Sequence, residues 1–186
     1  MIVLLSGTNR PDSNTRRITS AVEGIYHGLK VPCGVLDLAQ LPLEVFSPAA
    51  YAQRPASLAP FADRIIQATG LVVITPEYNG GMPGVLKYFI DLLKFPESFC
   101  MRPVCFIGLA AGAWGALRPV EHLQQLFAYR NAFVYSERVL LPHVQQLLDQ
   151  AGRIGNPDIV ARLKSQAVGF VDFVERLQGV QLRGAS

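Results

Sequence analysis

Five short apolar runs alternate with stretches of helical periodicity along this 186-residue chain, and this alternation constrains the fold more than any other feature. The runs lie at residues 2–6, 33–38, 70–75, 103–109 and 132–136. Each is continuously apolar, which is typical of strands buried on both faces of a parallel sheet. Apolar residues at helical spacing predict helices at about 18–29, 57–68, 83–94, 115–129 and 156–178. We therefore expect an α/β sandwich with helices on both faces of one sheet.

Five strands of this kind most often form a flavodoxin-like three-layer sandwich, with a parallel sheet of strand order 2-1-3-4-5. In such sheets ligands bind beyond the carboxyl ends of the strands, beside the first strand. The loops after the first, third and fourth runs are therefore the predicted binding site. We expect one domain over residues 1–178 and a frayed tail at 179–186, and no regular element between Val139 and Asn156.

The composition excludes several classes of protein. The longest apolar runs are far shorter than the ~20 residues of a membrane span, and we expect no secretory signal. A net charge of +3 without a basic run argues against nucleic-acid binding. Three cysteines without paired spacing predict reduced thiols in a cytoplasmic protein. Half of the residues are hydrophobic, so an interface between subunits is expected, with these candidates: Phe46, Tyr51, Tyr88 and Phe95.

The loop after the first run precedes a predicted helix and is rich in hydroxyl groups. They belong to Ser6, Thr8, Ser13 and Thr15. Unpaired N–H groups at a helix N-terminus favour phosphate, and Arg10 can hold phosphate oxygens bidentately. The loop lacks both the P-loop spacing with its lysine and the Rossmann glycine pattern, so it favours a phosphate monoester. Alternatively, Ser13 or Asp12 only caps the helix.

The other two loops are suited to a flat polar ring. The segment 75–84 combines glycines with Tyr78 and Asn79, which fits a planar heterocycle, although a simple glycine turn is the alternative. The segment 109–118 consists mostly of small residues, whose N–H groups can stabilise negative charge on a ring edge. Its Trp114 either stacks, forms an interface or packs in the interior. The connection at 41–60 is either an ordinary crossover or a lid or dimer contact.

These loops contain no nucleophile or acid–base pair, and no group of residues has metal-ligand spacing. We expect His27, His122 and His143 to be structural or surface residues away from the loops. No residue is predicted to be catalytic. A site that binds without reactive groups of its own is typical of an enzyme whose cofactor supplies the chemistry.

Three motifs together resemble the NADPH-dependent FMN reductase family, which includes chromate, quinone and azo-dye reductases. They are residues 6–15, residues 76–80 followed by Leu86, Lys87 and Asp91, and residues 112–118 followed by 121–123. The resemblance extends from residue 1 to about 175. It implies non-covalent FMN, NADPH or NADH as electron donor, and a small acceptor such as free flavin, a quinone, an azo compound or chromate. It also implies a homodimer or homotetramer with FMN near the interface.

The resemblance assigns a role to each loop. The FMN phosphate is expected at Thr8, Arg10, Ser13, Asn14 and Thr15. The isoalloxazine ring is expected at Pro76, Glu77, Tyr78, Asn79 and Gly80. Its pyrimidine edge is expected at Gly112, Trp114, Gly115 and Ala116, and we add Ser6 and Ala111 to the predicted cofactor site. The chain departs from many members at Thr8, Asp12, Ala110 and Ala111, and Asp12 should weaken phosphate binding unless it turns outward to cap the helix.

Two other functions remain as alternatives. A flavodoxin-type electron carrier would have the same fold, but such carriers are strongly acidic, whereas this chain has a sequence pI near 8.9. A scaffold protein without flavin would keep the fold alone, and the hydroxyl-rich loop argues against it.

Overall fold

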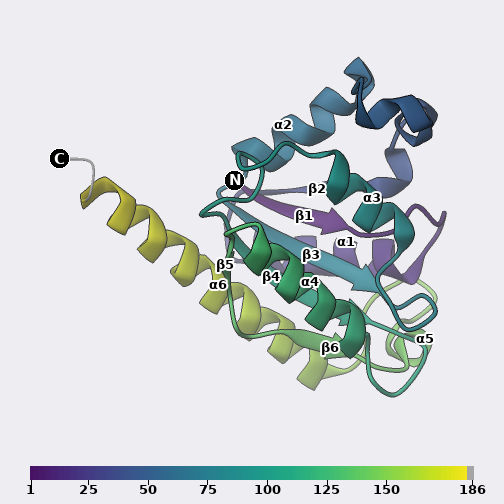
Figure 1. Ribbon diagram of the computed structural model, residues 1–186. Helices are drawn as coiled ribbons and strands as arrows, with labels where there is room; N and C mark the ends of the chain where they lie inside the picture. The colour runs from purple at the N-terminus through teal and green to yellow at the C-terminus, as the bar shows by residue number, and fades with distance from the viewer. Residues whose placement is uncertain (184–186) are drawn as a thin grey trace.

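All strands of the sheet run parallel in the order β2-β1-β3-β4-β5, and β6 is a further partner of β4 (Figure 1). The computed structural model describes residues 1–183, with side chains as far as residue 179. The strands are β1 (Ile2–Ser6), β2 (Cys33–Asp37), β3 (Gly70–Pro76), β4 (Pro103–Leu109), β5 (Phe133–Val134) and β6 (Val139–Leu141). This order confirms the flavodoxin-like topology, in which strand order reverses beside β1.

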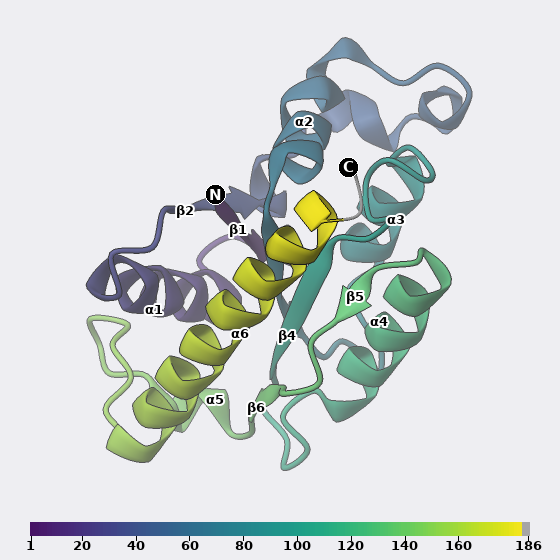
Figure 2. The same cartoon turned by 90° about the vertical axis from the view of Figure 1, so that its left-hand side faces the viewer.

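Helices cover both faces of the sheet, as Figures 1 and 2 show together. Helices α1 and α6 pack on one face, whereas α2, α3 and α4 pack on the other. The helices are α1 (Asn14–Gly28), α2 (Ala59–Gln67), α3 (Gly84–Leu92), α4 (Leu117–Tyr129), α5 (Val144–Leu147) and α6 (Pro157–Arg183). All five predicted helices are confirmed, whereas the expectation of no regular element between Val139 and Asn156 is wrong, because β6 and the short α5 lie there.

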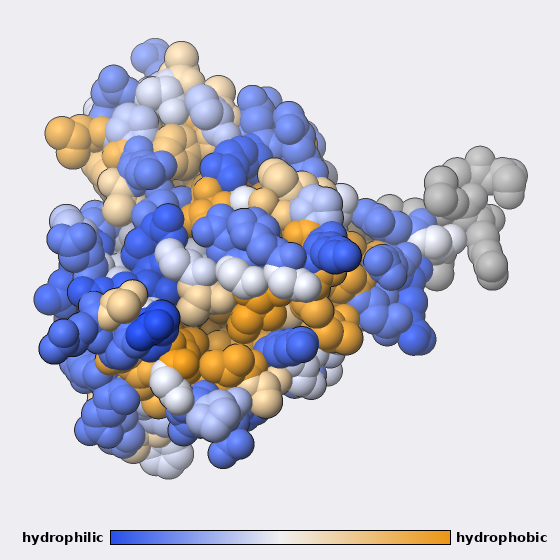
Figure 3. All heavy atoms as spheres, turned by 180° about the vertical axis from the view of Figure 1, so that it is seen from behind, coloured by the Kyte–Doolittle hydropathy of each residue, from blue (hydrophilic) through white to orange (hydrophobic). Residues whose placement is uncertain are grey.

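Alternating residues of β1 build two separate cores, because successive strand side chains point to opposite faces of the sheet. Leu4 is buried with Ile18 of α1 and Phe170 of α6, whereas Leu5 is buried with Leu86 of α3. On the side of α1 and α6, apolar side chains also gather at the centre of the outer surface (Figure 3). The high hydrophobic content is therefore used in two cores and still leaves apolar surface.

The predicted fifth strand at 132–136 is wrong in its extent, because the edge of the sheet is interrupted. Two short strands, β5 and β6, pair with β4 one after the other, with a break in the pairing between them. The sheet therefore has six strands. Between them the ring of Tyr135 packs on α6. The buried amide of Gln166 donates 3.0 Å hydrogen bonds to the carbonyls of Phe106 and Glu137. Gln166 thus satisfies carbonyl groups at the break, as buried backbone groups require.

The connection at residues 41–60 folds into short 3-10 turns, η2 (Leu43–Phe46), η3 (Pro48–Tyr51) and η4 (Ala56–Leu58), after η1 (Leu38–Gln40). Val45, Ala50 and Leu58 are buried in the core beneath α2 and α3. The hydroxyl of Tyr88 in α3 donates a 2.8 Å hydrogen bond to the Val45 carbonyl. This packing favours an ordinary crossover over a lid.

Helix α6 continues to Arg183, so residues 179–183 of the expected frayed tail are helical. No proline follows Leu177 to end the helix. The rest of that tail, residues 184–186, lies outside the described residues. Among the helices that the structure describes, none is long and apolar enough to cross a membrane.

Candidate functional site

A cavity of about 420 Å³ opens beyond the carboxyl ends of β1, β3 and β4, where the strand order predicts a binding site. Small-molecule sites typically measure about 300–1,000 Å³. The loop after β1 contributes Arg10, Pro11, Asp12, Ser13, Asn14 and Thr15. The loops after β3 and β4 contribute Pro76, Glu77, Tyr78, Leu109, Ala110 and Ala111. Val144 and Gln145 come from α5.

The predicted residues divide into two groups. Those that line the cavity are Arg10, Ser13, Asn14, Thr15, Pro76, Glu77, Tyr78 and Ala111. Those that are not part of its wall are Ser6, Thr8, Asn79, Gly80, Gly112, Trp114, Gly115 and Ala116. The second group mainly shapes the loops on which the first group lies.

The N-terminus of α1 forms one wall of the cavity. Ser13 is the N-cap, and its Oγ accepts a 3.1 Å hydrogen bond from the N–H of Arg16. The capping role is thereby confirmed for Ser13 rather than for Asp12. In the described part of the chain, the N–H groups of Asn14 and Thr15 have no protein acceptor. Together with the helix dipole, such unpaired N–H groups attract an anion.

Ser6 and Thr8 are buried behind this wall. The Oγ1 of Thr8 accepts a 3.2 Å hydrogen bond from the N–H of Arg10 and shares a 2.8 Å hydrogen bond with the Tyr78 hydroxyl. Thr8 therefore joins the loops after β1 and β3. The Oγ of Ser6 has no partner among the described residues. Ser6 does not line the cavity, so this hydroxyl belongs to the buried end of β1 rather than to the wall.

Asn79 and Gly80 form a tight turn that presents Tyr78 to the cavity. Their φ angles are +52° and +77°, and Tyr78 and Gly81 exchange hydrogen bonds of 2.9 and 3.0 Å across the turn. Two successive left-handed residues are typical of a type I′ turn, for which Asn-Gly is preferred. The glycine-turn interpretation is thus confirmed for Asn79 and Gly80, and the aromatic ring beside them is the part that reaches the site.

Glu77 connects three segments around the site. Its N–H donates a 3.1 Å hydrogen bond to the Leu109 carbonyl at the end of β4. Its carboxylate forms a 3.3 Å ion pair with Arg118 in the first turn of α4. The carboxylate is mostly buried and the guanidinium is mostly exposed. This contact fixes the mouth of the cavity and neutralises a carboxylate on its wall.

The loop after β4 is held by the segment between β6 and α5. The carbonyl of Ala110 accepts from the N–H of Val144 at 3.0 Å, and that of Gly112 accepts from the N–H of His143 at 3.3 Å. The His143 Nδ1 lies 3.1 Å from the Ala111 carbonyl oxygen. Within the described residues, the N–H groups of Ala111 and Gly112 have no acceptor. The loop therefore keeps donors free while its carbonyl groups are engaged elsewhere.

Gly115 and Ala116 pack beneath this loop rather than on the cavity. Gly115 has a φ of +56°, and a Cβ there would lie 2.8 Å from the backbone nitrogens of Leu141 and Pro142. Ala116 is fully buried, with a φ of +68°. The side chain of Trp114 is 65% exposed, so interior packing is the wrong interpretation for this residue. These residues shape the turn into α4.

The sequence analysis missed Val144 and Gln145. Both line the cavity from α5, in the stretch where no chemistry was expected. Their signal is weak, because a four-residue helix has no periodicity to detect. The expectation that His143 lies away from the loops is also wrong, since its ring contacts Ala111. Its role is nevertheless structural.

The cysteines lie outside the cavity. Cys33, Cys100 and Cys105 are all free thiols. Burial raises the pKa of the Cys105 thiol well above its ordinary value, and burial also raises the pKa of Cys33. Neutral thiols are poor nucleophiles. Among the described residues, no group of His, Cys, Asp and Glu is arranged to hold a metal ion.

The cavity combines an anion-binding end with a polar aromatic wall. Arg10 and the free N–H groups of α1 form the anion-binding end. Tyr78 and the loop after β4, with its free N–H groups, form the other end. The donor set fits FMN, which has a terminal phosphate and a ring edge that accepts hydrogen bonds.

Comparison with known proteins agrees with this geometry. Over residues 1–146 the sequence matches the family described as NADPH-dependent FMN reductase. A quinone reductase of Escherichia coli is 32% identical over 67% of this chain and 68% of its own length. An NAD(P)H-dependent FMN reductase of Pseudomonas aeruginosa is 28% identical over 94% of this chain and 95% of its own length.

Among solved structures, a flavoenzyme NAD(P)H:(acceptor) oxidoreductase from Paracoccus denitrificans aligns with a TM-score of 0.77. It is 22% identical, over 94% of this chain and 97% of that chain. This similarity shows the fold alone, and the sequence match shows the family. The chain belongs to the NADPH-dependent FMN reductase family and is an oxidoreductase that uses FMN and NAD(P)H.

Proposed function

We propose that the cavity holds FMN with its phosphate at the N-terminus of α1 and its ring between the loops after β3 and β4. The observation that carries this proposal is that all three loops expected from the family motifs contribute to one cavity. The anion-binding end and the aromatic wall lie within that same space, so one ligand can contact both.

Four predicted residues on this wall suit the phosphate. The N–H groups of Asn14 and Thr15 are free donors, and the guanidinium of Arg10 supplies charge-assisted hydrogen bonds. Ser13 contributes less through its side chain, because its Oγ already accepts from Arg16. The anion-binding groups gather at the N-terminus of α1, which suits a phosphate monoester.

The ring end is built from backbone donors and one aromatic side chain. Tyr78 is held in place by Thr8, and the loop at 110–112 is held by His143 and Val144. The free N–H group of Ala111, which lines the cavity, suits a carbonyl oxygen or nitrogen of a flavin edge, where negative charge develops on reduction. We infer that these residues bind and orient the ring.

When bound, FMN would accept hydride from NAD(P)H and pass the electrons on to the acceptor, which is chemistry that the cavity side chains do not supply. The electron acceptor is a small molecule. Relatives described as quinone reductase, 2-hydroxy-1,4-benzoquinone reductase and NADPH azoreductase support a planar conjugated acceptor. One cavity of about 420 Å³ suits successive use of a single site by donor and acceptor.

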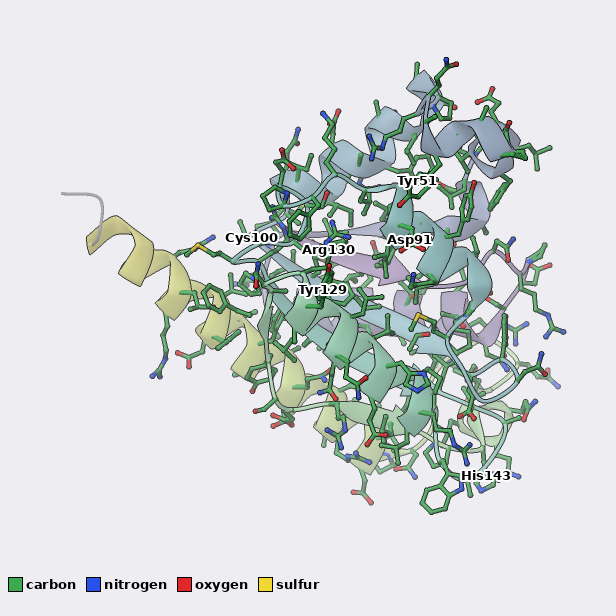
Figure 4. The ribbon with its side chains drawn as sticks, viewed as in Figure 1. Tyr51, Asp91, Cys100, Tyr129, Arg130 and His143 are labelled. Atoms are coloured by element: carbon green, nitrogen blue, oxygen red, sulfur yellow. The ribbon has the colours of Figure 1, made fainter. Side chains whose placement is uncertain are left out.

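We also propose a homodimer or homotetramer. Tyr51, Phe95 and Tyr129 are 66%, 59% and 79% exposed, and aromatic side chains are enriched in interfaces. Figure 4 shows Tyr51 and Tyr129 on the side of α3 and α4, near Arg130. Of the other expected interface residues, Phe46 is partly exposed and stacks on Tyr88, which bonds within its own chain. A cytoplasmic location is proposed from the free thiols.

The proposal is tested with the purified protein and added FMN. Titration should quench flavin fluorescence and saturate at one FMN per chain. Addition of NAD(P)H without oxygen should then abolish the absorbance of the oxidised flavin. Addition of a quinone should then restore that absorbance. A protein that neither quenches FMN fluorescence nor oxidises NAD(P)H would contradict the proposal.

A further inference from the structure

His143 lies in the β6–α5 corner, residues 142–144, where its side chain reaches the loop after β4 (Figure 4). Its φ is +50°, an uncommon backbone conformation for a residue with a Cβ. The imidazole Nδ1 lies 3.1 Å from the carbonyl oxygen of Ala111. A carbonyl oxygen only accepts, so Nδ1 carries the proton and donates this hydrogen bond. His143 itself does not line the cavity, whereas Ala111 does.

Three successive carbonyls of the loop after β4 are bonded to this corner. Those of Ala110 and Gly112 accept from backbone N–H groups of Val144 and His143. The carbonyl of Ala111, between them, accepts from the imidazole. The two peptide groups that meet at the Cα of Ala111 are therefore both anchored, one by a backbone N–H and the other by a side chain.

Packing does not hold this part of the loop. Residues 111–114 are exposed, and a Cβ at Gly112 would meet no atom within 4 Å. An exposed segment without packed side chains depends on its hydrogen bonds for a fixed conformation. Among the described hydrogen bonds, the one from His143 is the only bond to the carbonyl of Ala111. Without the imidazole, this peptide group is free to rotate.

We propose that His143 is a positioning residue of the FMN site, whose imidazole keeps the Ala111 carbonyl oxygen turned toward the corner and away from the flavin ring. The inference rests on the proposed function. A carbonyl oxygen carries partial negative charge, so its rotation into the cavity would oppose the negative charge that develops on reduction. The same residue also offers the ring a free N–H group. A wall whose dipoles are fixed in advance favours the reduced flavin.

His143→Gly removes the imidazole and suits the same φ. The released carbonyl should weaken the binding of reduced FMN about tenfold more than that of oxidised FMN, because only the reduced ring is negatively charged. The midpoint potential of bound FMN should then fall by about 30 mV, which is the tenfold value for a two-electron couple. Bound riboflavin should show the same shift, since the loop is proposed to contact the ring rather than the phosphate.

His143→Asn is the rescue variant. Asparagine also tolerates a positive φ, and its Nδ2 is attached to Cγ as Nδ1 is in the imidazole. It can therefore donate to the same carbonyl. The ratio of oxidised to reduced Kd should return to within about twofold of wild type. A residue that only stabilised the fold would not restore the potential together with the donor.

Lys30→Gly is the matched control. Lys30 follows α1, has a φ of +59° and lies outside the cavity. Its replacement makes the same change of backbone, from a residue with a Cβ to glycine at a positive φ, without altering the loop after β4. The Kd for FMN and the midpoint potential should equal those of wild type.

The experiment titrates flavin-free wild type and the three variants with FMN and with riboflavin, following flavin fluorescence. The midpoint potential of each flavin-saturated protein is then measured against a reference dye. His143→Ala makes the same comparison if His143→Gly does not fold. A wild-type potential in the variant that lacks the imidazole, or an equally low potential in His143→Asn, would overturn the inference alone. Absence of flavin binding by the wild type would overturn the proposed function as well.

Discussion

The hydroxyls of Thr8 and Tyr78 share a 2.8 Å hydrogen bond that joins the loop after β1 to the loop after β3. These residues are 70 positions apart in sequence. Thr8 is fully buried, whereas Tyr78 reaches the cavity wall. The two proposed ends of the FMN site are therefore joined through one partly buried contact.

Tyr78→Phe should weaken FMN binding by about two- to tenfold, because it removes a hydrogen bond worth roughly 0.5–1.5 kcal/mol and leaves the Thr8 hydroxyl without that partner. The ring remains, so the cavity keeps its shape. The Kd from fluorescence titration is the measurement. Tyr129→Phe is the control, since this exposed tyrosine lies outside the cavity. An equal Kd for Tyr78→Phe and wild type would show that the bond does not support the site.

Arg10→Ala should weaken FMN binding ten- to hundredfold, because a charge-assisted contact of about 1.5–3 kcal/mol is lost. FAD should bind much more weakly than FMN to the wild type, since its phosphates are not terminal. Calorimetry of FMN and FAD measures both effects. Arg17→Ala removes the same charge from an exposed position outside the cavity and should change little. Comparable affinity for FAD, or an unaffected Arg10→Ala variant, would contradict the phosphate assignment.

Gly115→Ala should destabilise the protein by about 1–3 kcal/mol, because the φ of +56° and the nearby backbone nitrogens leave no room for a Cβ. The free energy of unfolding in urea is the measurement. Gly112→Ala lies in the same loop and would meet no atom within 4 Å, so it should be nearly neutral. Equal stability of the two variants would show that the loop adapts more easily than its packing suggests.

Ala substitutions of Cys33, Cys100 and Cys105, made one at a time, should leave FMN-dependent NAD(P)H oxidation largely intact. Iodoacetamide at neutral pH should not modify Cys105 in the folded protein, because its raised pKa keeps the thiol neutral and it is fully buried. Substitutions of His27 and His122 should also leave FMN-dependent NAD(P)H oxidation largely intact. A thousandfold loss in any variant that still binds flavin would reveal acid–base or thiol chemistry.

Sedimentation at micromolar concentration should show an oligomer, because a typical interface of ~1,600 Å² is consistent with the exposed aromatic side chains near α3 and α4. Tyr129→Glu should shift the equilibrium toward monomer by placing a charge in that interface. Val168→Glu, which replaces an exposed apolar residue of α6 on the opposite face of the sheet, is the control for a general effect of charge. A monomer of about 20 kDa with full FMN occupancy and turnover would rule out the proposal.

The sequence by itself determined the layers, the strand order and the three loops. Buried parallel strands must be continuously apolar, so the runs at 2–6, 70–75 and 103–109 were recognisable without tertiary information. Right-handed crossovers bring the carboxyl ends of parallel strands together, and therefore the positions of the loops followed from the order of the elements. Arg10 and Tyr78 could be predicted as wall residues for this reason.

Only the tertiary structure decided which loop residues face the cavity and which shape the backbone. Asn79 and Gly115 adopt left-handed conformations, and their roles depend on packing between distant segments. Val144 enters the site because β6 pairs with β4, and β6 forms only after the edge strand is interrupted at Tyr135. Such contacts join residues far apart in sequence, whereas periodicity reports only on neighbours within one helix or strand.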